Sequence, residues 1–281
     1  MLKTPIVHEQ KPLTSNQQAT LQIPVYGKIY SSILRFTVSG TDASVAAIKA
    51  QIGQIRLTIN GKDVVNATAT KLFDVQSALG QYVNAPSGTA GVIELNLGRL
   101  LFNNPLHRDA FGFGTDNITS IQVSVTAGTL TTITDVQAFT TRTSERQNLG
   151  VYCKLINYPQ SFNSTGDHTV DTLPRDPDSA YLAVFAEDGA SGTQTFGEVR
   201  VNNVTIKERQ PRAVNEQIMS SDRFSQPAGY FCYMFTDGDP TSLLPMQGVS
   251  DLRFINTFSV APGAAGYDMT SLTMVGLPAS K

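Results

Sequence analysis

The residues that could perform acid–base or nucleophilic chemistry are few and widely separated. The chain has three histidines, His8, His107 and His168, and each has a polar residue on at least one side. The Gly-x-Ser-x-Gly turn that presents the nucleophile of an α/β-hydrolase does not occur in the sequence. We therefore expect the three histidines to be surface residues. The sequence predicts no enzyme, no catalytic residue and no organic cofactor.

One short acidic motif could bind a hard cation. Asp237-Gly238-Asp239 offers carboxylate oxygens, which Ca²⁺ prefers as ligands. The remaining ligand spacing of an EF-hand is absent, so a plain β-turn is the expected structure. The question of a metal site stays open, with structural calcium as a possibility.

A second acidic cluster, Asp171, Asp176 and Asp178, surrounds Leu173-Pro174-Arg175. Paired carboxylates can perform acid–base work on a glycosidic bond. The first half of the chain has a matching Ile23-Pro24 with no carboxylates beside it. We therefore interpret the cluster as turn sequence.

Two glycine-containing stretches resemble phosphate-binding loops only in part. Gly112-Phe113-Gly114 lacks the third glycine and the following helix of a dinucleotide loop, which indicates a turn. Gly61-Lys62 is followed by Asp63 rather than Ser or Thr, and Asn60-Gly61 is a strong hairpin signal.

Composition excludes several classes of protein. The 281 residues carry a formal charge of -2, which argues against a basic nucleic-acid-binding domain. The chain has no tryptophan, which disfavours a sugar-stacking cleft. Cys153 and Cys232 lie in apolar runs and are expected to be buried free thiols. We expect no signal peptide and no membrane span, and therefore a protein made in the cytosol. The four glycosylation sequons, at Asn66, Asn117, Asn163 and Asn203, are then chance matches.

Alternating apolar and polar residues predict antiparallel strands along most of the chain. The clearest are at 21–23, 33–38, 55–59, 92–97, 121–125, 199–201, 230–235 and 252–254. Two segments have helical spacing. Leu72, Val75 and Leu79 predict a helix between Thr70 as N-cap and Gly80, and Val214 and Ile218 predict another that runs to about residue 224.

The two halves of the chain match in order, which predicts an internal duplication. Ile55-Arg56-Leu57 corresponds to Val199-Arg200-Val201, and each is followed by its helix. Residues 118–123 correspond to 249–254. We expect an all-β fold of two tandem eight-stranded jelly rolls, each with one short inserted helix.

The predicted domains are an N-terminal arm over residues 1–17, a first jelly roll over 18–142, and a linker with the second jelly roll over 143–281. The arm lacks strand alternation and helical periodicity. The polar stretch Thr143–Asn148 is the expected junction.

This arrangement resembles the double jelly-roll major capsid proteins of tailless icosahedral viruses, and most of all those of corticoviruses and finnlakeviruses. The resembling stretches are Ile23-Pro24 to Gly40, Ile55 to Val64, Asn157 to Arg175, and the helix at 214–224. The resemblance implies a bacteriophage capsid protein that forms a homotrimer, a pseudo-hexagonal block that tiles an icosahedral shell.

The resemblance also implies the partners and the location. Neighbouring capsid trimers, penton and minor capsid proteins and an internal lipid membrane are the expected partners, without sequence-specific nucleic acid binding. The expected location is the virion, after synthesis in the host cytoplasm. Two alternatives remain open: a viral spike or receptor-binding protein, and a two-domain carbohydrate-active enzyme or lectin. A carboxylate pair facing across a cleft would favour the enzyme.

Overall fold

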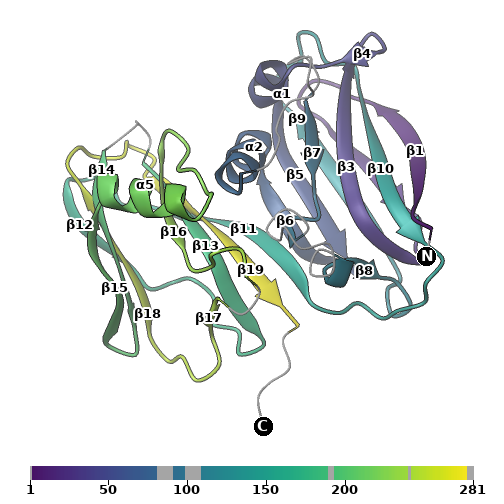
Figure 1. Ribbon diagram of the computed structural model, residues 1–281. Helices are drawn as coiled ribbons and strands as arrows, with labels where there is room; N and C mark the ends of the chain where they lie inside the picture. Colours follow the sequence, from purple (N-terminus) through teal and green to yellow (C-terminus); the bar gives the residue numbers. More distant parts are fainter. Residues whose placement is uncertain (1, 81–90, 99–108, 189–192, 240–241, 277–281) are drawn as a thin grey trace. The chain divides into compact units, whose positions relative to one another are not determined.

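The computed structural model describes residues 2–80, 91–98, 109–188, 193–239 and 242–276. The chain divides into two compact units. The first holds the residues up to 156 except 78–80, and the second holds 78–80 and the residues from 157 onward. Both units are built from β-sheets (Figure 1).

Two sheets form the first unit. One has the order β1-β10-β3-β4, with the short strands β7 and β8 also paired to β3. The other has β6, β5, β9 and β2 side by side. The bounds are β1 Thr4–Pro12, β2 Gln18–Ile23, β3 Lys28–Val38, β4 Thr41–Asp42, β5 Ile52–Ile59, β6 Lys62–Thr68, β7 Val92–Glu94, β8 Phe113–Gly114, β9 Ile121–Ala127 and β10 Asp135–Thr143.

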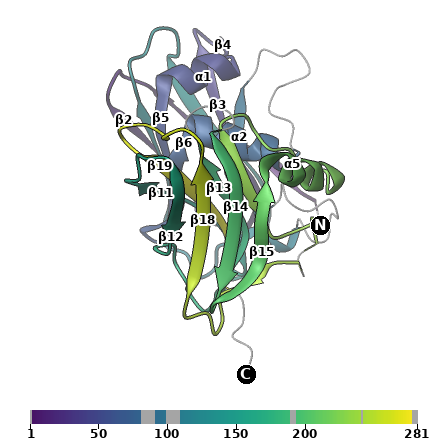
Figure 2. The same ribbon diagram turned by 90° about the vertical axis from the view of Figure 1, so that its left-hand side faces the viewer.

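The second unit repeats this plan, with β11 running into it from the first unit, because the division falls after Ile156. One of its sheets contains β16, β13, β19 and β11, with β17 also paired to β13, and the other has the order β12-β18-β14-β15 (Figure 2). The bounds are β11 Tyr152–Gln160, β12 Gly166–Val170, β13 Ser179–Glu187, β14 Gln194–Val201, β15 Val204–Pro211, β16 Tyr230–Met234, β17 Leu244–Pro245, β18 Leu252–Phe258 and β19 Tyr267–Val275.

Both units have the same strand order when β4, β8 and β17, which have two residues each, are set aside. The first, eighth, third and sixth strands form one sheet, and the second, seventh, fourth and fifth form the other. This is the order of an eight-stranded jelly roll. The prediction of two tandem jelly rolls is confirmed. Matching strands also share their burial pattern, since β9 and β18 both alternate strictly from buried to half-buried.

A helix follows the fifth strand of each unit, as predicted. These helices are α2 (Ala69–Ala78) and α5 (Arg212–Ser221). The hydroxyl of Thr68, rather than that of Thr70, accepts a hydrogen bond from the Lys71 amide at the start of α2. A further helix in the first unit, α1 (Val45–Gln51), was not expected. It has seven residues and buries only Ile48 and Gln51, which is too short a pattern for periodicity to reveal.

The predicted N-terminal arm is wrong. Residues 4–12 form β1, which pairs antiparallel with β10 from Thr4 opposite Arg142 to Pro12 opposite Asp135. The strand was missed because most of its side chains are exposed on both faces, and its register shifts between Val7 and Gln10. The expected junction, 143–148, begins at Thr143, the last residue of β10, and ends before β11.

The predicted superposition of Ile55 on Val199 is also wrong, by two residues. Leu57 pairs with Val123 in the first unit, and Val199 pairs with Phe254 in the second. Leu57 is therefore the equivalent of Val199. A shift of two residues keeps every side chain on its face of the sheet, so the alternation alone could not detect it.

Candidate functional site

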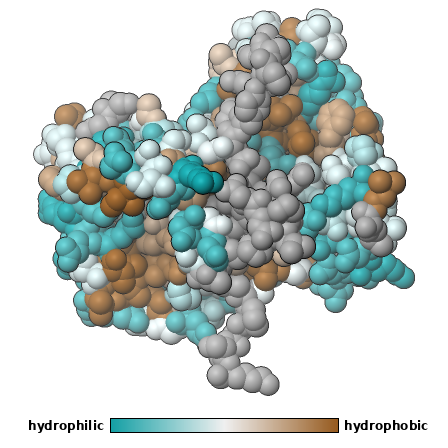
Figure 3. Space-filling model, in the orientation of Figure 1, coloured by the Kyte–Doolittle hydropathy of each residue, from teal (hydrophilic) through white to brown (hydrophobic). Residues whose placement is uncertain are grey.

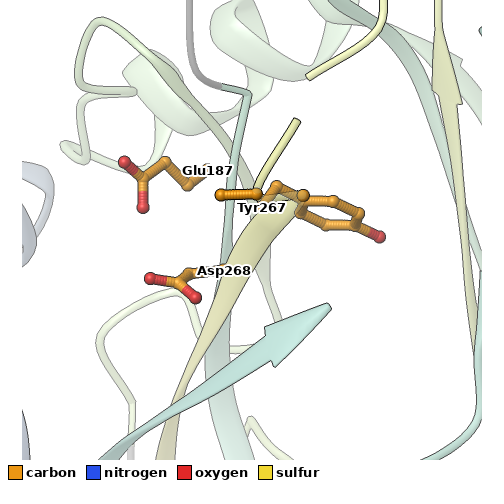
Figure 4. A pocket seen from close by; sticks show the side chains of 5 residues that line it. Glu187, Tyr267 and Asp268 are labelled. Atoms are coloured by element: carbon orange, nitrogen blue, oxygen red, sulfur yellow. The ribbon is translucent and has the colours of Figure 1, made fainter. Parts of the chain in front are cut away.

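A carboxylate pair lines a shallow pocket of about 160 Å³ in the second unit. Glu187 ends β13 and Asp268 lies at the start of β19, one step beyond the paired residues Ala186 and Met269. Figure 4 shows both carboxylates on one side of the strands and the ring of Tyr267 on the other. The pair therefore lies side by side on one sheet face rather than facing across a cleft.

Tyr267 belongs to the interior of the sandwich rather than to this pocket. Its hydroxyl accepts a hydrogen bond from Asn256 at 2.9 Å and lies 2.8 Å from Nδ1 of His168. Asn256 is fully buried and also bonds Gln194 and Tyr233. Burial raises the pKa of Tyr267 far above its ordinary value. This network pairs the buried polar groups of Asn256, Tyr233 and Tyr267, as a stable core requires, and leaves Oε1 of Gln194 without a hydrogen bond.

The histidines do not form a catalytic centre among the described residues. His8 is buried in β1, which contradicts its predicted surface position, and its Nε2 lies 2.8 Å from the hydroxyl of Thr140. His168 is half-buried and stacks on Phe162 with ring centroids 4.4 Å apart. Burial lowers the pKa of both histidines. His107 lies outside the described residues.

The two acidic motifs form turns. The amide of Asp239 donates to the carboxylate of Asp237 at 3.0 Å, so this motif is held by its own backbone. The amide of Ser179 donates to the carbonyl of Asp176, and the hydroxyl of Tyr181 donates to the carbonyl of Pro174. In the described part of the chain, no group of three or more histidine, cysteine or acidic side chains could hold a metal ion.

The glycine motifs are structural. Asn60 and Gly61 have φ angles of 50° and 75° and form the two-residue turn between β5 and β6, as predicted. Phe113-Gly114, expected in a turn, is the short strand β8 paired with β3. Cys153 and Cys232 are buried free thiols, which confirms their prediction, and burial raises the pKa of both.

The prominent surface feature is a set of exposed apolar side chains on β15 and α5. Val204 and Ile206 of β15 are 63% and 42% exposed, and Val214 and Ile218 of α5 are 46% and 39% exposed. We call these four residues the β15–α5 surface. Figure 3 shows apolar surface over α5. Val214 and Ile218 carried the helix prediction, yet α5 buries Asn215 and Met219 instead.

Such exposed apolar residues on a sheet edge indicate an interface. Edge strands present unpaired backbone groups, and natural proteins usually protect them with charges, bulges or a covering element. The sequence did not predict this surface, because the spacing of apolar residues does not distinguish burial within one chain from burial against a second protein. The apolar side chains of the β15–α5 surface are suited to packing against another protein rather than to catalysis.

Two family models match the chain. Residues 10–143 match the viral coat protein P2 N-terminal domain, and residues 152–270 match the viral coat protein P2 C-terminal domain. The two matched segments coincide with the two jelly rolls. No curated protein sequence is significantly similar to this chain.

Solved capsid structures share the fold. The major capsid protein P2 from bacteriophage PM2 has a TM-score of 0.83 at 13% identity, with 99% of this chain and 98% of that chain covered. The major capsid protein of Sulfolobus turreted icosahedral virus has a TM-score of 0.68 at 15% identity, with 99% and 98% covered. The PBCV-1 virus capsid has a TM-score of 0.63 at 7% identity, with 98% and 94% covered.

These matches agree with the observed architecture, in which two jelly rolls of identical strand order each carry a helix after the fifth strand. The family is one of structural proteins rather than enzymes. The chain belongs to the viral coat protein P2 family and is a double jelly-roll major capsid protein.

Proposed function

We propose that the chain forms a homotrimer, the building block of an icosahedral virion shell. The supporting observation is the repeated strand order, because two equivalent jelly rolls per chain give six in a trimer. Six similar barrels around a threefold axis make a pseudo-hexagonal block, which can tile a closed surface. Closed rotational symmetry is also the usual arrangement of homo-oligomers.

The test is the mass of the purified protein in solution. Three chains of 30.3 kDa give about 91 kDa, which light scattering coupled to size exclusion can distinguish from the monomer. A trimer interface of this kind is expected to be large, so the trimer should persist at micromolar concentration. A monomer at that concentration would contradict the proposal.

The trimers would contact neighbouring trimers across the shell, and penton and minor capsid proteins at the vertices, after synthesis in the host cytoplasm. Electron microscopy of particles in which this chain is the dominant protein tests this arrangement. Icosahedral particles are expected. Filaments or open sheets would contradict a closed shell.

We further propose that the shell encloses a lipid membrane, as the family resemblance implies. No helix in the described part of the chain is long and apolar enough to cross a membrane. Lys3 and Lys11, which could attract anionic headgroups, pair with Asp109 and Glu9 in this structure. Lipid extraction from purified particles is the test, and lipid-free particles would overturn this part of the proposal.

A further inference from the structure

The fifth strands of the two jelly rolls differ in how their outer edge is covered. In the first unit, β6 has β5 on one side, and on the other Val65 and Asn66 pair in parallel with Leu155 and Ile156 of β11. In the second unit, β15 pairs with β14 and with no other strand in the described residues. Figure 2 shows β15 at the edge of its sheet.

Side-chain burial follows this difference. Both strands begin after a two-residue turn, since Ile59 pairs with Lys62 and Val201 pairs with Val204. Counted from these turns, Val64 of β6 is the equivalent of Ile206 of β15. Val64 is 1% exposed, whereas Ile206 is 42% exposed.

The helices that follow these strands show the same contrast. Counted from the first residue of each helix, Val75 of α2 is the equivalent of Ile218 of α5. Val75 is 1% exposed and Ile218 is 39% exposed. The same element thus carries an apolar residue at the same position in both units, and that residue is buried only in the first.

The strand that covers β6 is the first strand of a jelly roll, and the chain has one other such strand. This is β1, which pairs with β10 and with no other strand in the described residues. Its Val7 is 60% exposed. A hollow of about 430 Å³ lies beside β1 and is lined by Leu2, Ile6 and Tyr26, among others.

We propose that β1 of a second copy of this chain covers β15 and the apolar side of α5, as β11 covers β6. A hollow of about 320 Å³ lies beside β15 and can receive side chains from that strand. Its lining combines apolar and polar residues: Ile206, Met234, Phe235, Lys207, Asp222, Thr236, Asp237 and Ser242. This inference rests on the proposed trimer and names its contact surfaces.

The contact joins the β15–α5 surface of one copy to β1 of another. A pair of copies therefore has one β15–α5 surface and one β1 still uncovered. Such a head-to-tail contact closes only as a ring or continues as a filament. Three copies close a ring in which every β15 meets a β1.

The test uses three exposed valine or isoleucine positions. I206D and V7D place a carboxylate on the two proposed surfaces, while V260D places one at a residue of the second unit that is 58% exposed and outside both. We expect I206D and V7D each to lower the association constant at least about 100-fold, since a buried charge at an interface is costly. V260D should remain a trimer. Circular dichroism should show that all three variants are folded. If I206D or V7D is not folded, I206T or V7T replaces it, because threonine keeps a β-branched side chain.

Mixing I206D with V7D provides a second readout. Each variant retains the surface that the other lacks, so the mixture should form one intact contact and a species of about 61 kDa from two 30.3 kDa chains. Absence of this species at tens of micromolar would overturn the head-to-tail contact. A trimeric wild type whose I206D or V7D variant stays trimeric would overturn the named surfaces alone. A monomeric wild type would overturn the trimer itself.

Discussion

Asn60 and Asn202 occupy the same position in the two jelly rolls and make the same hydrogen bonds. The side-chain oxygen of Asn60 accepts from the amide and hydroxyl of Thr119 and from the Ser120 amide. The side-chain oxygen of Asn202 accepts in the same way from Ser250 and from the Asp251 amide. Each side-chain amide then donates to a backbone carbonyl, that of Asn117 or Gly248.

Both asparagines also have positive φ angles, 50° for Asn60 and 47° for Asn202. Asparagine tolerates this left-handed conformation better than most residues. Each one therefore fixes the hairpin between the fourth and fifth strands to the turn before the seventh strand. A duplication that kept this arrangement in both copies explains why the two halves match in order.

The first prediction is that N60A and N202A each destabilise the protein by about 2 kcal/mol, from lost hydrogen bonds and the strain of alanine at positive φ. N60G and N202G are the matched controls, because glycine removes the hydrogen bonds without that strain. The glycine variants should lose less stability than the alanine variants in urea unfolding. Equal losses would show that the backbone conformation contributes nothing.

The parts of the fold that could be predicted are those whose apolar side chains are buried within the single chain. The alternation of β9 and β18, the Asn60-Gly61 turn and the helix containing Leu72 all follow from local pattern and are buried within one chain. β1 could not be predicted because most of its side chains lie exposed, on both faces, and only His8 is buried.

The β15–α5 surface shows where a correct helix prediction gave the wrong buried face. The spacing of Val214 and Ile218 indicated a buried helix face, but the single chain leaves that face exposed. This apolar face would be buried only if a second molecule covered it. The apolar spacing therefore matches burial in an assembly rather than burial within one chain. Glu187 and Asp268 come to line one pocket through the register of β13 and β19, which no local pattern specifies.

The second prediction concerns pH. Burial lowers the pKa of His8, with a contribution from the charge of Arg142, and burial also lowers the pKa of His168. Well above pH 6.5, the ordinary pKa of histidine, both are neutral in the folded and unfolded states. Below pH 6.5 the unfolded state binds protons first, so stability falls until the lower pKa of the folded state is reached. Each unit of pKa depression corresponds to about 1.4 kcal/mol.

Urea unfolding at several pH values between 7 and 5 measures this loss. H8Q and H168Q should each make the free energy of unfolding less dependent on pH, because glutamine does not titrate. Wild-type stability that rises as the pH falls through 6 would contradict the prediction.

The third prediction is that deletion of residues 1–13 destabilises the first unit, because β1 is a strand of its sheet rather than an arm. The deletion removes the pairing with β10 and the contact between His8 and Thr140. A loss of about 3 kcal/mol is expected, which lowers the melting temperature by about 6–12 °C for a domain of this size. Deletion of residues 1–3, which precede the strand, is the control and should change the melting temperature by less than about 3 °C. An unchanged melting temperature in the longer deletion would contradict this prediction and support the interpretation of residues 1–17 as an arm.

The fourth prediction uses the two cysteines as separate reporters of two strands. Cys153 lies on β11 and Cys232 on β16. Both are buried, and burial raises the pKa of each thiol well above its ordinary value, so little thiolate exists at neutral pH. Neither should react with an aromatic disulfide reagent in the folded protein, whereas both should react in denaturant. In C153A and C232A the remaining thiol reports the exposure of one strand. If the two single-cysteine proteins become reactive at different urea concentrations, β11 and β16 become exposed in separate steps, and coincident midpoints would show one cooperative transition. Rapid labelling of either cysteine without denaturant would contradict the buried positions from which this prediction follows.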